Sequence, residues 1–179
     1  MAGGLVATAL LLATQVAWTN SAAIHLEGSW VARVPGTPLL WTYSLAPDPS
    51  GKSASISGAI QVPVMPTVFV PGLFEEAEYV SPMVGKIVMT GPDTATFTAL
   101  WYGMKKVMPF EQVVFIGVTS GTIKFTSAGK AEVSHFLGFY APSTDADNDG
   151  LPDPGSAASL CLPAVSYDTQ VPIFPTCTP

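Results

Sequence analysis

Charged residues are scarce in this sequence. Only 11% of its 179 residues are charged, and seven Lys and Arg face thirteen Asp and Glu, which gives a net charge of −6. A protein that binds nucleic acid needs a basic patch to neutralise phosphates, and no such patch is present. We therefore expect no nucleic-acid partner.

Motifs for catalysis are also missing. The chain has two His and two Cys, and it contains no Gly-x-Ser-x-Gly elbow, no His-Glu-x-x-His and no phosphate-binding loop. A hydrolase would need two or three convergent polar groups, which this sequence does not assemble. An enzyme is therefore the minority hypothesis, and no catalytic residue is predicted.

The N-terminal region reads as a targeting segment. Residues 5–18 form an apolar run, and Ser21 and Ala23 follow at the spacing that signal peptidase accepts. We predict a signal peptide at residues 1–23, hence a secreted, periplasmic or extracellular protein. The run is shorter than the roughly 20 residues that span a bilayer, and Gln15 interrupts it, so we expect no transmembrane anchor after cleavage. A buried N-terminal helix is the alternative.

The middle of the chain alternates apolar and polar residues with a period of two. Short runs rich in Val, Ile, Thr and aromatic residues predict strands, and the short breaks between them predict antiparallel neighbours. The expected fold is all-β, an antiparallel up-and-down β-barrel of about eight strands at residues 24–140. A sandwich is the other way to protect the sheet edges. The expected strands are 27–34, 39–46, 53–64, 85–90, 95–102, 111–118, 121–126 and 131–140.

One short motif in the first strand resembles a known family. Gly28-Ser29-Trp30 is similar to the Gly-x-Trp signature with which lipocalins and related calycin barrels open. The resemblance implies that Trp30 closes the barrel floor and packs against a basic residue from the last strand. An ordinary core tryptophan is the alternative.

Several aromatic residues are candidates for lining a cavity in the barrel. Residues 131–139 alternate so that His135 lies in an apolar row, while Phe97 and Trp101 share a face of another strand with small residues. A polar group in an apolar pocket is typical of a small-molecule site. A packed core with a satisfied histidine is the alternative. The predicted ligand-binding residues are Trp41, Phe97, Trp101, His135 and Phe139.

After Tyr140 the sequence becomes rich in Pro, and we expect an irregular tail at residues 141–179. An aspartate-rich run in this tail predicts a structural Ca²⁺ site, because alternating carboxylates on a turned loop supply the oxygen ligands that Ca²⁺ takes. The run resembles the calcium repeats of thrombospondin type 3 and, less closely, an EF-hand loop, whose twelfth-position Glu is Ser156 here. A solvated acidic turn is the alternative. The predicted ligands are Asp145, Asp147, Asp149 and Asp153, with Gly150 at the turn.

The two cysteines, Cys161 and Cys177, both lie in the tail. An even count in an exported chain predicts a disulfide between them, and two free thiols are the alternative.

Three functions follow from these features. The first is a secreted barrel that binds an apolar or amphipathic small molecule and carries a calcium-clamped tail. The second is a solid barrel without catalytic activity that acts as a calcium-stabilised structural or surface-association module. The third is an isomerase or cyclase with His135 as acid or base. The ligand and the oligomeric state do not follow from the sequence.

Overall fold

The computed structural model describes residues 26–37, 40–60, 70–127 and 129–172. Within these residues there are nine strands and one short 3-10 helix. They are β1 (Gly28–Arg33), β2 (Leu40–Pro47), β3 (Ser53–Ile60), β4 (Tyr79–Val80), β5 (Met83–Met89), β6 (Thr94–Val107), β7 (Phe110–Ser127), β8 (Lys130–Tyr140), η1 (Pro142–Thr144) and β9 (Leu160–Gln170).

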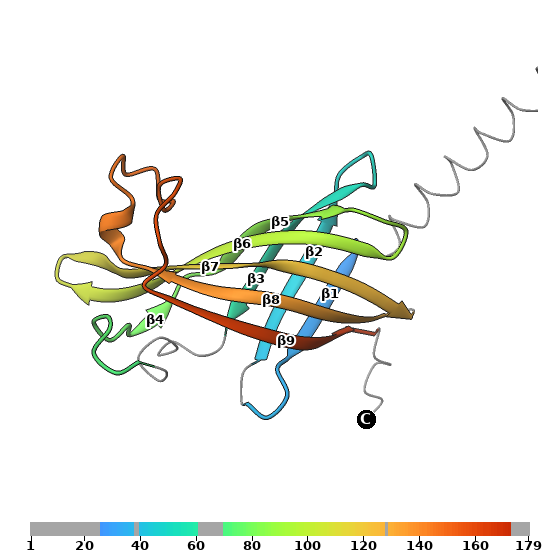
Figure 1. Cartoon of the computed structure of the whole chain (residues 1–179), viewed down its shortest axis with the longest axis horizontal. Helices are drawn as coiled ribbons and strands as arrows, with labels where there is room; N and C mark the ends of the chain where they lie inside the picture. The colour runs from blue at the N-terminus through green and yellow to red at the C-terminus, as the bar shows by residue number, and fades with distance from the viewer. Residues whose placement is uncertain (1–25, 38–39, 61–69, 128, 173–179) are drawn as a thin grey trace, which may run out of the picture.

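Eight of the strands close into a barrel (Figure 1). Each of β1, β2, β3, β5, β6, β7, β8 and β9 pairs antiparallel with the next in this order, and β9 returns to pair with β1. The two-residue β4 adds only to the far part of β6. The predicted antiparallel up-and-down barrel of about eight strands is confirmed.

The strand β9 corrects the expectation of an irregular tail. It lies within residues 141–179, and its pairing with β8 and β1 closes the barrel. The period-two signal was hidden because β9 buries the polar side chains of Ser166 and Asp168 and exposes Tyr167. Pro163 also obscured the signal, because proline has no backbone N–H to donate to a neighbouring strand. At Pro163, however, β9 pairs only with β8, since the pairing with β1 begins at Tyr167, so a missing N–H on the other side is tolerated.

Strand β7 also differs from the expectation, because it is longer than either strand predicted in this region. The expected strands 111–118 and 121–126 are one continuous strand, and the turn expected at Gly121 is absent. Gly121 instead marks a close approach of β8, since a Cβ at this position would lie 2.1 Å from the Ser134 carbonyl oxygen and 2.6 Å from the His135 Cα. Glycine inside a strand often marks such an approach of another backbone.

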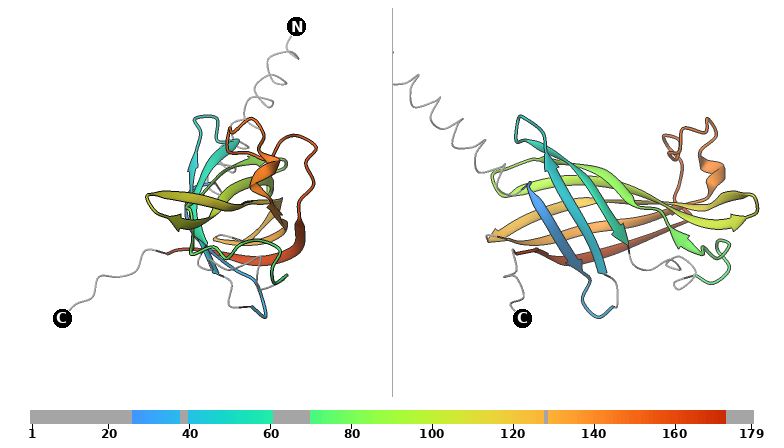
Figure 2. Two further views of the ribbon diagram at one scale, coloured as in Figure 1. Left: turned by 90° about the vertical axis from the view of Figure 1, so that its left-hand side faces the viewer. Right: turned by 180° about the vertical axis from the view of Figure 1, so that it is seen from behind.

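The long strands β6 and β7 continue past the barrel as a hairpin, beside the loop between β8 and β9 (Figures 1 and 2). The tip of this hairpin exposes Met108 and Phe110, at 90% and 76%. Within the described residues, no helix is long and apolar enough to cross a bilayer.

Candidate functional site

The barrel interior is filled by aromatic side chains at both ends. Near the start of β8, Trp30 packs on Phe125 with ring centroids 5.9 Å apart. Near the end of β8, Phe139 packs edge-on against both Trp101 and Phe115, at 6.2 and 5.5 Å. A cavity lies between these two clusters.

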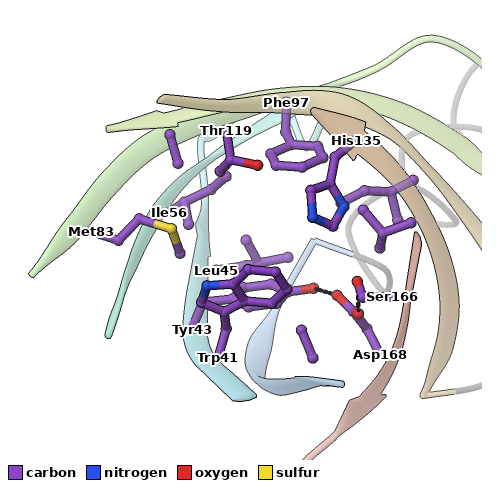
Figure 3. A pocket seen from close by; sticks show the side chains of 14 residues that line it. Trp41, Tyr43, Leu45, Ile56, Met83, Phe97, Thr119, His135, Ser166 and Asp168 are labelled. Carbon is purple, nitrogen blue, oxygen red and sulfur yellow. Dashed lines mark hydrogen bonds between the residues drawn. The ribbon is translucent and has the colours of Figure 1, made fainter. Parts of the chain in front are cut away.

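The cavity has a volume of about 50 Å³. An enclosed water needs at least about 10–15 Å³ on this measure, so the cavity has room for roughly three to five waters. Each of the eight barrel strands contributes at least one residue to its lining (Figure 3). They are Ala32, Trp41, Tyr43, Leu45, Ile56, Met83, Phe97, Ala99, Thr119, Ile123, Val133, His135, Ser166 and Asp168.

His135 is the polar group of the aromatic wall. Its ring meets Trp41 edge-on at 5.4 Å and Phe97 at 6.3 Å between ring centroids. The residue is 6% exposed, and its Nδ1 atom has no hydrogen-bond partner among the described residues. Burial lowers the pKa of His135 and outweighs the Val133 backbone, which acts to raise it, so the imidazole is neutral at pH 7. A neutral imidazole can accept one hydrogen bond and donate another.

Three hydrogen-bonded residues, Tyr43, Ser166 and Asp168, form a polar wall of the cavity (Figure 3). The Tyr43 hydroxyl donates to Asp168 Oδ2 at 2.6 Å, and the Ser166 hydroxyl donates to Asp168 Oδ1 at 2.7 Å. Burial raises the pKa of Asp168, although both hydroxyls act to lower it. Burial and the Asp168 carboxylate together raise the pKa of Tyr43 well above its usual value. Tyr43 therefore stays a neutral donor.

The structure brings together three of the five predicted ligand-binding residues. Trp41, Phe97 and His135 line the cavity. Trp101 and Phe139 do not line it, because they belong to the aromatic cluster at one end, where they are 1% and 0% exposed. The alternation of each strand placed all five side chains inside the barrel, but it carries no information on their depth along the barrel axis.

Sequence reasoning missed the two polar residues contributed by β9. Ser166 and Asp168 lie two positions apart, which is the spacing of one strand face. That spacing was the available signal, and the surrounding prolines masked it.

Trp30, the tryptophan of the Gly-x-Trp motif, is 1% exposed. Its ring stacks on Tyr43 at 6.4 Å, with an angle of 7° between the planes. The hydroxyl of the same Tyr43 donates a hydrogen bond to Asp168, a residue of the last strand β9. Membership in the lipocalins stays a prediction.

A second candidate site is the acidic loop between β8 and β9. Ligand oxygens of Asp145, Asp147 and Asp149 lie within 4.8 Å of one another. The fourth predicted ligand, Asp153, is outside this group and accepts a hydrogen bond from the Ala146 amide at 3.2 Å. The loop thus gathers three of the four predicted carboxylates.

The geometry of the three carboxylates fits a Ca²⁺ ion. Calcium binds oxygens at roughly 2.3–2.6 Å, so two ligands of one ion are separated by at most about 5 Å. Asp145 Oδ1 is buried and has no hydrogen-bond partner within the described parts of the chain, which leaves one ligand atom available to an ion. The loop is attached to the barrel by the Tyr102 hydroxyl, which donates to the Gly150 carbonyl at 2.8 Å.

The predicted disulfide involves one described residue. Cys161 is exposed on β9. Cys177 lies outside the described residues, so the pairing stays a prediction.

Comparison with known proteins gives one distant likeness. No protein-family model and no curated protein match the chain. A solved structure of EF1p2_mFAP2b bound to DFHBI matches with 15% sequence identity and a TM-score of 0.46, covering 86% of this chain and 98% of that one. A likeness at this level supports no inference about this protein.

Proposed function

We propose that this protein binds a small amphipathic molecule in the central cavity of its barrel. The single observation that carries the proposal is the unpartnered Nδ1 atom of His135, buried in a cavity with mostly apolar walls. A buried polar atom without a partner is unfavourable, and a ligand that supplies the partner removes this penalty.

The remaining walls support the same function. Ligand sites are usually apolar cavities with a few convergent polar groups, and here Thr119 and Asp168 accompany His135. The volume of about 50 Å³ limits the enclosed part of the ligand to a few non-hydrogen atoms. The alternative, a solid barrel that acts as a structural module, requires this cavity to stay closed to solutes.

Filling the cavity should abolish binding. In an NMR titration of the wild-type protein with 2-propanol as probe, we expect saturable shifts of the His135 ring and the Trp41 indole. Ala99 is 1% exposed and lines the cavity, so Ala99→Leu adds three carbons where the probe would lie. We expect this variant to bind at least about tenfold more weakly, because the lost space cannot be regained in a close-packed interior.

The matched control is Ala46→Leu, which makes the same change at an exposed position of β2. This control should bind 2-propanol like the wild type. Equal binding by Ala99→Leu, or no saturable shift in the wild type, would count against a ligand cavity and for the structural module.

We further propose that the acidic loop holds a structural Ca²⁺ ion through Asp145, Asp147 and Asp149. We also propose that the chain is exported, as its first 23 residues predict. Outside the cell Ca²⁺ is abundant enough to occupy a weak site. The first 23 residues lie outside the described structure, and the proposed export rests on their sequence.

Calcium should therefore raise the melting temperature relative to chelator. A ligand at 100 times its dissociation constant stabilises the native state by about 2.7 kcal/mol, which for a domain of this size corresponds to roughly 5–11 °C. Differential scanning calorimetry with Ca²⁺ or EDTA measures the shift. The variant Asp147→Asn should reduce it, while Asp93→Asn, at an exposed turn, should not. Identical melts with Ca²⁺ and EDTA would refute the site.

A further inference from the structure

We propose that the cavity selects a small ammonium ion, which pairs with Asp168 between the aromatic walls. The inference rests on the proposed function, since it names the chemical class of the molecule that the cavity takes. It starts from the burial of the Asp168 carboxyl group.

Asp168 is a buried acid without a counter-charge. The residue is 3% exposed, and its described hydrogen-bond partners are the neutral hydroxyls of Tyr43 and Ser166. Each carboxylate oxygen has two lone-pair sites, so one donor on each leaves further capacity. Burial raises the pKa of this carboxyl group because a buried charge without an opposite charge is unfavourable, and a bound cation would remove that penalty and favour the carboxylate.

No basic side chain of the protein can supply the cation. All seven Lys and Arg of the sequence fall within the described residues, and none of them lines the cavity. Lys105 forms an ion pair with Glu75 at the surface, with 3.0 Å between Nζ and Oε2. The remaining six are exposed, namely Arg33, Lys52, Lys86, Lys106, Lys124 and Lys130.

The aromatic walls favour a cation over an anion. Trp41, Tyr43 and Phe97 present their rings to the cavity, and aromatic faces attract ammonium groups (Figure 3). His135, the other titratable group of the lining, does not compete for Asp168, because its burial keeps it neutral. Its Nδ1 atom is available to accept a hydrogen bond from an ammonium N–H.

The volume sets the size of the ion. At about 50 Å³ the cavity holds roughly three to five water-sized groups. An ammonium ion of about four non-hydrogen atoms, or the ammonium end of a longer molecule, matches this space.

The test compares two probes of equal size by NMR titration at pH 7 and constant ionic strength. Isopropylammonium chloride and 2-propanol each have four non-hydrogen atoms and differ in charge. We expect the wild-type protein to bind the cation at least about tenfold more tightly, since the pairing with Asp168 is desolvated. In Asp168→Asn that preference should disappear, so that this variant binds the two probes with affinities within about twofold of each other.

Asp93→Asn serves as the matched control, because it removes the same charge at an exposed turn and should leave both affinities unchanged. The wild-type comparison needs no variant, so it stands even if Asp168→Asn does not fold. If 2-propanol binds the wild type as tightly as the cation, or if the preference survives in Asp168→Asn, the ammonium inference is wrong and the cavity function remains. If neither probe binds the wild type, the proposed function fails as well.

Discussion

A chain that ends at Ala158, before β9, should lose its folded state entirely. Without β9 the neighbouring strands β8 and β1 both present open edges, and the barrel interior is exposed along its whole length. The net stability of a domain is only about 5–15 kcal/mol, so the loss of one of eight barrel strands exceeds it. Circular dichroism should show no cooperative thermal transition, and size-exclusion chromatography should show aggregates.

The control for this truncation is a chain that ends at Pro172, which keeps β9 and removes only residues outside the described structure. It should unfold cooperatively. A cooperative transition in the Ala158 truncation would show that the barrel does not depend on β9, and it would contradict the closed topology.

Trp101→Ala should destabilise the protein by roughly 3–5 kcal/mol without affecting the binding of 2-propanol. Trp101 is 1% exposed, packs on Phe139, and covers Gly117 so closely that a Cβ there would lie 2.2 Å from the indole ring. The surrounding glycine and aromatic rings cannot fill the space that the indole leaves, so a cavity remains. Urea denaturation measures the loss of unfolding free energy.

Trp41→Ala is the informative partner of this variant, because Trp41 lines the cavity and contacts His135. This substitution should change the affinity for 2-propanol as well as the stability. If Trp101→Ala weakened binding as much as Trp41→Ala does, the end cluster would be part of the site and the assignment of the cavity lining would be wrong.

The strand pattern made most of the fold predictable. In β8, alternate residues from Ala131 to Phe139 are buried, as the period of two indicates. The prediction of strand ends failed in β7, where a single glycine was taken for a turn between two strands. Gly121 reads as a turn in sequence but allows two strands to approach in space, and only the pairing with β8 distinguishes the two.

The site was predictable only along its aromatic wall. His135 was found because it stands in an otherwise apolar row, and Trp41 was found as an aromatic residue of the second strand. Asp168 was missed because a buried acid in a strand has the same sequence signature as a solvated one, and its partner Tyr43 lies 125 positions away in the chain. Long-range hydrogen bonds of this kind follow from the closed topology, which no local pattern encodes.

The closure of the barrel also bears on how the protein folds. The pair that joins β1 to β9 brings Trp30 next to Gln170, so the contact has a very large sequence separation. Topologies dominated by such contacts fold slowly, since the loop entropy must be lost before the contacts form. Of the eight barrel strands, β9 is synthesised last, and it carries Ser166 and Asp168. A growing chain on the ribosome therefore lacks the Ser166 and Asp168 wall of the cavity until the final strand has docked.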